Sequence, residues 1–200
     1  MIIQIMALAV FSPFLQLQQN DWHLAKQKDG ITVYTKAVDQ SGLKSTKVVS
    51  LFEISRKRFL KEIINVELHD ELIDNCQNVA LIKNSGDSLI VFYEQFDLPW
   101  PAGDRDVVVQ MKVKANTKPN ESEVESLALS NVFEPKKSFI RIKNFKANWK
   151  IIELSPNKIY VEYIATLHPE GTVPLWVVNL FLADVPHNSF KKLKKHLDLK

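Results

Sequence analysis

The chain is poor in the residues that build metal sites, disulfides and phosphate loops. Of its 200 residues, one is cysteine and five are glycine. A single cysteine, Cys76, excludes an intramolecular disulfide framework and any multi-cysteine zinc site. The few glycines leave no Gly-rich phosphate loop, and no histidine falls in a metal-binding spacing such as His-Glu-x-x-His. The sequence therefore predicts no metal and no cofactor.

The net charge does not point to a nucleic-acid partner. The 26 lysines and arginines exceed the 23 aspartates and glutamates by only three, which is too weak a basic excess to predict nucleic-acid binding. Hydrophobic residues make up 46% of the chain, as in ordinary globular domains, and 200 residues suffice for about one domain. We expect one folded domain with a sizeable core and no nucleic-acid partner.

The first seventeen residues carry no charged side chain. This apolar run contains Pro13 and ends at the polar stretch Gln18–Asp21, so it is too short and too interrupted for a membrane-spanning helix. It is closer to a secretory signal peptide, although it lacks a basic start and a clean small-residue cleavage site. We expect residues 1–19 to be a signal peptide, residues 20–200 to be the domain, and the protein to be periplasmic or secreted. A short amphipathic N-terminal helix on a cytoplasmic protein is the alternative.

The first third of the chain mixes helical and strand patterns. Ser55 is a good N-cap for a helix over Arg56–Asn65, where Phe59, Leu60 and Ile63 follow helical spacing. The remaining expected elements are a helical turn over Trp22–Lys28, strands over Ile31–Thr35 and Leu43–Ile54, and a second helical piece over Val66–Cys76.

From Val79 onward the pattern is β for nearly ninety residues. The connections are too short for crossover helices, so the sheet is expected to be antiparallel. In the clearest strand, Val107, Val109 and Met111 share one face. The expected strands are Val79–Lys83, Ser88–Asp97, Asp106–Ala115, Ser122–Phe133, Ser138–Ala147, Trp149–Leu154 and Lys158–Leu167.

A long amphipathic helix closes the chain. We expect Pro174 to be its first residue and Pro186 to break or kink it. Its apolar stripe consists of Leu175, Val178, Phe181, Leu182, Val185, Phe190, Leu193 and Leu197. The whole order predicts an α+β domain in which this helix lies across the concave face of the sheet.

The stretch Pro99–Asp106, Pro-Trp-Pro-Ala-Gly-Asp-Arg-Asp, lies between two strongly β-patterned runs. Two prolines and a glycine force a turn there, because proline fixes φ and cannot donate to a ladder. Arg105, between Asp104 and Asp106, is suited to a charge-assisted tie that locks the loop onto the sheet. A hairpin tip with a solvated charge cluster is the alternative.

Four stretches, in order along the chain, resemble the START domain, the lipid-transfer domain related to steroidogenic acute regulatory protein, here as a bacterial-type single-domain member. They are Trp22 with Lys28–Tyr34, Pro99–Pro101 with Asp104–Asp106, Trp149-Lys150, and Pro169–Pro174 with Trp176 and Asn179. The resemblance spans about residues 21–197. It implies a helix-grip fold, in which a curved antiparallel sheet wraps around the long C-terminal helix and encloses an apolar cavity for a lipid, sterol or other hydrophobic molecule.

The resemblance further implies non-enzymatic binding, and transfer, of that molecule. Met111 stands where some sterol-binding relatives carry a basic residue, so no sterol-hydroxyl partner follows from it. Glu94 either bonds a ligand head group or is a surface glutamate on the outer strand face. From strand phase and helix stripe, the expected lining is Tyr93, Glu94, Val109, Met111, Leu127, Leu129, Tyr163, Val178 and Leu182.

Other chemistry has little support in the residues. We interpret His69-Asp70-Glu71 as a solvated helix face and Cys76 as a buried small hydrophobe. A cyclase- or aromatase-like enzyme of the wider helix-grip superfamily would need acid–base groups in the cavity, and an interaction module with a filled core is a third possibility. The lysines of the last helix, Lys191, Lys192, Lys194 and Lys195, suit its macrodipole or a transient contact with an anionic membrane.

Overall fold

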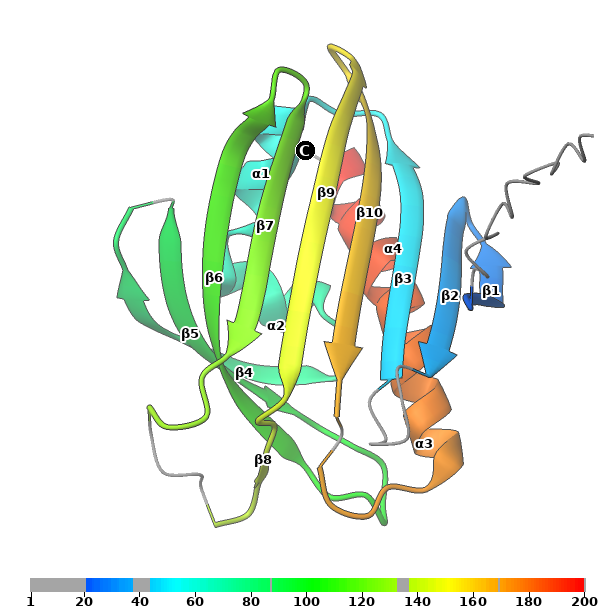
Figure 1. The fold of residues 1–200 in the computed structure, drawn as a ribbon, viewed down its shortest axis with the longest axis vertical. Coiled ribbons are helices and arrows are strands. Elements are labelled where there is room, and N and C mark those ends of the chain that lie inside the picture. The colour runs from blue at the N-terminus through cyan, green and yellow to red at the C-terminus, as the bar shows by residue number, and fades with distance from the viewer. Residues whose placement is uncertain (1–20, 38–43, 87, 133–136, 169, 200) are drawn as a thin grey trace, which may run out of the picture.

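A computed structural model describes residues 21–37, 44–86, 88–132, 137–168 and 170–199. The expected signal peptide, residues 1–19, lies outside the described residues. One large sheet curves around the helices, and Figure 1 views it with the strands in front and α1, α2 and α4 behind. The fold is therefore a sheet that grips helices on a single face.

The sheet runs in the order β1-β2-β3-β10-β9-β7-β6-β5-β4, with β8 paired beside β6. Every neighbouring pair along that order is antiparallel, as expected, whereas the short β8 pairs in parallel with β6. The β3–β10 pair joins the beginning of the domain to its end. The strands are β1 His23–Lys28, β2 Ile31–Ala37, β3 Lys44–Phe52, β4 Cys76–Asn84, β5 Leu89–Phe96, β6 Arg105–Lys118, β7 Glu121–Ala128, β8 Ile140–Arg141, β9 Phe145–Ser155 and β10 Lys158–Leu167.

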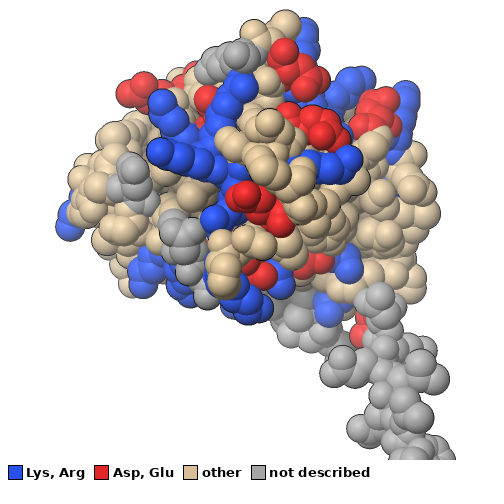
Figure 2. All heavy atoms as spheres, turned by 90° about the horizontal axis from the view of Figure 1, so that it is seen from above, with Lys and Arg blue, Asp and Glu red and all other residues tan. Residues whose placement is uncertain are grey.

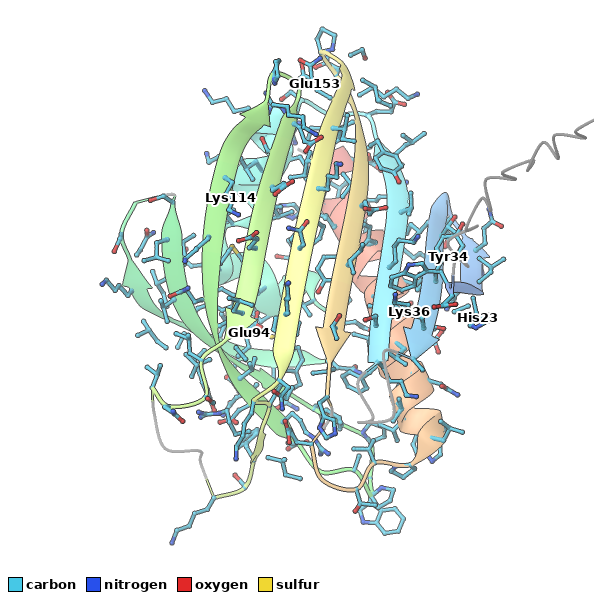
Figure 3. The ribbon with its side chains drawn as sticks, in the orientation of Figure 1. His23, Tyr34, Lys36, Glu94, Lys114 and Glu153 are labelled. Atoms are coloured by element: carbon cyan, nitrogen blue, oxygen red, sulfur yellow. The ribbon has the colours of Figure 1, made fainter. Side chains whose placement is uncertain are left out.

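Trp22–Lys28 and Ser138–Ala147 are two expected elements that the structure changes. Trp22–Lys28 is no helix, because His23–Lys28 pairs with β2 as the edge strand β1. Trp22 lies under the ammonium groups of Lys36 and Lys47, 5.1 and 4.9 Å from its ring centroid, and Figure 3 labels Lys36 and Tyr34 on β2 at this edge. The expected strand Ser138–Ala147 reduces to the two residues of β8, and β9 begins at Phe145. Pairing with a neighbouring strand decided both cases, and local pattern does not encode it.

The helices follow the expected positions more closely. The side chain of Ser55 accepts a hydrogen bond from the amide of Arg58 and caps α1, as predicted. The second helical piece is shorter than expected and ends at Leu72, and Cys76 instead begins β4. The helices are α1 Arg56–Ile63, the 3₁₀ turn η1 Val66–Leu68, α2 His69–Leu72, α3 Leu175–Asn179, the π-helical turn η2 Leu180–Asp184 and α4 Val185–Asp198.

The closing helix differs from its prediction in detail. Pro174 is the N-cap of α3 rather than its first helical residue, and Pro186 lies in the first turn of α4, just after the π-turn. Leu175 leaves the expected stripe because it is 71% exposed, whereas Val177 is fully buried. No helix among the described residues is long and apolar enough to cross a membrane.

The core lies between the concave face of the sheet and the helices. Phe59 of α1 and Phe190 of α4 meet Phe52 of β3, with ring centroids 4.8 and 6.2 Å from that of Phe52. Val109 and Met111 of β6 are buried in the same core, as their strand phase predicted. Cys76 is buried and burial raises the pKa of its thiol to about 12, which fits an inert small hydrophobe.

Candidate ligand-binding site

A pocket of about 210 Å³, here called the inner pocket, lies between the sheet and the closing helix. Strands β3, β5, β9 and β10 contribute to one wall, and α1, α2, η2 and α4 contribute to the other. Its side chains are mainly apolar, and six are aromatic: Phe96, Phe145, Trp149, Tyr163, Phe181 and Phe190. An apolar hollow of this kind is the usual form of a small-molecule site.

Three of these aromatic rings form a continuous wall. Trp149 of β9 and Tyr163 of β10 are cross-strand partners whose ring centroids lie 4.6 Å apart. Trp149 also stacks on Phe190 of α4, with the centroids 5.3 Å apart and the rings 10° from parallel. Aromatic pairs of this kind contribute about 0.5–1.5 kcal/mol beyond their buried area. The wall is therefore fixed by both the sheet and the closing helix.

The π-turn η2 shapes the other wall of the inner pocket. The hydroxyl of Thr46 on β3 donates a hydrogen bond of 2.7 Å to the carbonyl of Leu182. This turn presents Phe181 and Leu182 to the inner pocket and also to a smaller pocket of about 40 Å³ beside α3. The smaller pocket continues to Leu98 and Val177, so the Pro99–Asp106 turn and α3 lie at its end.

A buried ion pair lies on the edge of the inner pocket. His69 of α2 and Glu94 of β5 are 6% and 5% exposed, and Nδ1 lies 2.8 Å from Oε1. The other ring nitrogen lies 3.3 Å from the carbonyl oxygen of Ile63. Burial acts to lower the pKa of His69, but the hydrogen bond and charge of Glu94 raise it above its ordinary value overall. Both ring nitrogens face acceptors, which suits the doubly protonated imidazolium.

This pair corrects two interpretations of the sequence. His69 does not lie on a solvated face, because α2 turns it inward, where its ring meets the edge of Phe92 at 5.2 Å. Glu94 is not an outer-face glutamate either, since it pairs with Val107 on the face that carries the core. Figure 3 labels Glu94 in the lower half of the sheet.

Tyr163 brings a hydroxyl group to the inner pocket. Among the described residues it has ring contacts with Trp149 and Phe190 but no hydrogen-bond partner. Burial, with a smaller contribution from the charge of Glu94, raises the pKa of this phenol. The hydroxyl is therefore protonated at physiological pH and is available as a donor.

The charged turn at Pro99–Asp106 is built differently from the expectation. The guanidinium of Arg105 donates to the carbonyl oxygens of Ala102, Gly103 and Glu170, which ties the turn to the loop before α3. Asp106 instead takes two hydrogen bonds from Arg141 of β8, at 2.8 and 3.0 Å.

Two further contacts complete the tie. The hydroxyl of Tyr93 donates to Asp106 at 3.1 Å, and the carboxylate of Asp104 accepts from the amide of Leu98 at 3.2 Å. Arg105, Asp106 and Arg141 are all buried. The cluster therefore has a structural role: its hydrogen bonds join separate parts of the chain and fix the end of the smaller pocket.

The predicted lining residues separate into four groups. Tyr163 and Leu182 line the inner pocket, and Val178 lines the smaller pocket beside Leu182. Val109 and Met111 face the same side of the sheet but are packed into the core away from both pockets. Glu94 lines neither pocket, but it is hydrogen-bonded to His69, which lines the inner one.

The other three predicted lining residues lie elsewhere. Tyr93 directly precedes Glu94 in β5, so the two side chains point to opposite faces of the sheet, and Tyr93 faces away from the pocket. Leu127 pairs with Gln110 on that same outer face and is 41% exposed. Leu129 lies just beyond the end of β7.

Sequence patterns do not identify most of the aromatic lining residues. Trp149 belongs to a family motif, and Phe181 and Phe190 belong to the apolar stripe of the closing helix. Phe96 and Phe145 lie at strand ends, where alternation gives no reliable phase.

The lysines at the end of α4 have partners in this fold. Lys191 lies 3.3 Å from Asp29, Lys192 lies 2.9 Å from Asp74, and Lys194 donates to the carbonyl of Leu51. Figure 2, seen from above, shows acidic and basic side chains interspersed over this end of the molecule. These contacts weaken the interpretation of the lysines as a membrane-binding patch.

A larger hollow of about 940 Å³ lies outside the core, between α1 and strands β4–β6. It is an open groove edged by Lys57, Arg58 and Lys61, with Leu81 and Ile90 at its base. Open to solvent, it gives a ligand less burial than the inner pocket. Among the described residues, no group of three or more His, Cys, Asp or Glu is placed to hold a metal ion.

A curved antiparallel sheet closed by a C-terminal helix over an apolar pocket defines a helix-grip protein. The model of the START domain family matches residues 2–200, and the chain belongs to that family. Members of this family generally bind and transfer lipids or other hydrophobic ligands.

Known proteins similar to this chain agree with the assignment. An uncharacterized protein, PA1579 of Pseudomonas aeruginosa, is 28% identical over 193 residues, covering 95% of this chain and 93% of that protein. Phosphatidylcholine transfer protein of Bos taurus is 23% identical over 180 residues, covering 87% and 83%. A solved STAR-related lipid transfer protein fragment from Xanthomonas axonopodis has a TM-score of 0.80 at 23% identity, covering 90% and 99%.

Proposed function

We propose that this protein binds one hydrophobic molecule in the inner pocket, without chemical change, and carries it between membranes. The observation that supports this most is the aromatic wall of Trp149, Tyr163 and Phe190, which encloses space instead of filling it. Closely packed cores leave few voids larger than a water molecule. Membership of the START family and the names of the lipid-transfer relatives agree with a carrier.

The size of the inner pocket limits what it takes in this conformation. Pockets for drug-sized ligands measure roughly 300–1,000 Å³, whereas an engineered apolar cavity of about 150 Å³ holds benzene. At about 210 Å³ the inner pocket fits a small hydrophobe or part of one apolar chain. A larger lipid would need η2 and α3 to move outward, which would join the smaller pocket to the inner one.

The direct test is to ask what the purified protein carries. Native mass spectrometry of the full chain after gentle purification should show a mass increment that organic extraction removes. The extract should contain a hydrophobic molecule in about a 1:1 ratio to protein. A chain that arrives empty and takes up no hydrophobe from mixed lipid vesicles would contradict the proposal.

An enzymatic role in the manner of a cyclase or aromatase is the alternative. Glu62 and His69 do border the inner pocket. However, Glu62 lies 3.0 Å from His196, and both ring nitrogens of His69 are bonded to Glu94 and Ile63. A general acid or base must reach its substrate within hydrogen-bond distance. Since Glu62 and His69 already have hydrogen-bond partners within the protein, we favour the carrier function over the enzyme.

We further propose that membrane contact is made by the α3 end of the molecule. Trp100 is 89% exposed, Leu175 71% and Trp176 54%. The turn that holds Trp100 packs against α3 through Leu98 and Val177, so these apolar side chains lie at the same end as the smaller pocket. Tryptophan favours membrane–water interfaces. Replacing Trp100 and Trp176 by Ala together should reduce vesicle co-sedimentation, and unchanged sedimentation would contradict this.

Export through an N-terminal signal remains a proposal that rests on the uncharged residues 1–17. Expression of the full chain in a bacterial host should yield a mature protein shortened by about twenty residues outside the cytoplasm. Intact mass and cell fractionation measure this, and a full-length cytoplasmic product would favour the alternative.

A further inference from the structure

The polar side chains around the inner pocket are nearly all hydrogen-bonded to the protein. Thr46 donates to the carbonyl of Leu182, and Ser189 donates to the carbonyl of Val185. Glu62 and His69 have the partners described above. The hydroxyl of Tyr163, by contrast, has no hydrogen-bond partner among the described residues. A hydroxyl without a protein partner can donate to an acceptor on a bound molecule.

The indole of Trp149 repeats this pattern beside Tyr163. Its N–H also has no hydrogen-bond partner in the described part of the chain, and its ring is 4.6 Å from that of Tyr163 between centroids. Indole nitrogen is a donor only, and Tyr163 is a protonated phenol because burial raises its pKa. The aromatic wall therefore contains two donor groups, the Tyr163 hydroxyl and the Trp149 N–H, without an acceptor among the described residues.

The charges near the pocket oppose an anionic guest. Glu62 borders the pocket, and the charge of Glu94 is felt at Tyr163. Of the basic side chains, His69 lines the pocket, and its Nδ1 lies 2.8 Å from Glu94; His196 lies 3.0 Å from the lining residue Glu62. A carboxylate or phosphate would lose its hydration there and gain no uncommitted cation among these groups.

We propose that the ligand is an uncharged hydrophobe that carries one accepting oxygen, a carbonyl or hydroxyl, bound by the Tyr163 hydroxyl with Trp149 beside it. This inference rests on the proposed carrier function and narrows its ligand class. Tyr163 is the specificity-determining residue, because its hydroxyl distinguishes such a ligand from a plain hydrocarbon.

The experiment uses three probes with the same phenyl-plus-four-carbon skeleton: 4-phenyl-2-butanone as the ketone, n-butylbenzene as the hydrocarbon and 4-phenylbutyrate as the anion. Their affinities are measured by calorimetry at pH 8 for the wild-type chain, Tyr163→Phe and Tyr160→Phe. Tyr160 lies on the same strand with its side chain on the opposite face, so it is the matched control. Thermal unfolding confirms that each variant is folded.

The wild-type chain should bind the ketone at least tenfold more tightly than the anion. Tyr163→Phe should weaken the affinity for the ketone by about two- to tenfold, the value of one hydrogen bond. Its affinity for the hydrocarbon should stay within twofold of the wild-type value. Tyr160→Phe should change neither. Hydrocarbon binding with an unaltered ketone affinity in Tyr163→Phe, or tightest binding of the anion, overturns this inference but leaves the carrier function standing. Failure of all three probes to bind the wild-type chain overturns both.

Discussion

At the scale of single residues, Asp106 is a buried charge whose carboxylate is held by several hydrogen bonds. Its carboxylate accepts from Nε and a terminal nitrogen of Arg141 and from Tyr93, and it is fully buried. A buried charge that loses its partner is costly even where the pair itself contributes little. Breaking this tie should therefore destabilise the fold by more than the intact pair stabilises it.

Arg141→Ala should lower the free energy of unfolding by about 3–5 kcal/mol, since it leaves Asp106 buried without its guanidinium partner. Urea denaturation followed by circular dichroism measures this. Lys114→Ala, which removes an exposed pair with Glu125, is the control and should leave the midpoint unchanged. Equal small effects in the two variants would contradict the account of the turn.

His69 should make stability depend on pH. Its pKa is raised in the folded state, so its contribution is complete below the ordinary value near 6.5 and is lost as pH rises through the folded value. The stability difference between wild type and His69→Gln should therefore be largest near pH 6 and narrow toward pH 9. Urea midpoints across this range test it, with His23→Gln on the exposed edge strand as control. A difference that widens with pH would be inconsistent with a protonated His69.

Sequence periodicity placed some of these residues and not others. The phase of β6 correctly put Val109 and Met111 inside. It did not show that they would be packed solid, because an apolar strand face looks the same against a neighbour as against a pocket. Tyr93 and Glu94 were both expected to line the site, although neighbours on a strand face opposite ways. The partner of Glu94, His69, lies 25 residues earlier, and no local pattern connects the two.

At the scale of elements, the π-turn η2 decides the shape of the closing helix. A π-turn widens the helix by one residue per bond and is common at functional sites. Thr46 of β3 anchors it by binding the carbonyl of Leu182. Sequence reasoning expected a kink at Pro186 and could not anticipate the π-turn before it, because the anchor comes from a strand more than a hundred residues away.

Thr46→Val keeps the side-chain shape but removes the donor to the Leu182 carbonyl. It should lower the free energy of unfolding by about 1–3 kcal/mol, the cost of a buried carbonyl without its partner. Thr46→Ser retains the hydroxyl and should recover most of the difference, and guanidinium denaturation of the three proteins measures this. Identical midpoints for the Val and Ser variants would show that the hydroxyl does not hold η2.

At the scale of the whole molecule, the short connections predicted the antiparallel meander, and family motifs predicted the grip around the closing helix. Two features were beyond the sequence. The pairing of β3 with β10 closes the sheet between segments more than a hundred residues apart. The volume of the inner pocket depends on the distance between the sheet and the helices that line it, and amino-acid composition does not specify that distance.

The central claim, that the inner pocket holds the hydrophobic ligand, is tested most directly by filling it. Ala165 of β10 lines the pocket, and Ala165→Phe would place a ring in that space. Ala80→Phe adds the same ring at an exposed position of β4 and is the matched control. Calorimetry with n-butylbenzene should show at least a tenfold weaker affinity for Ala165→Phe, with a thermal midpoint at or above wild type, and no change for Ala80→Phe. Undiminished binding by a folded Ala165→Phe protein would contradict the account.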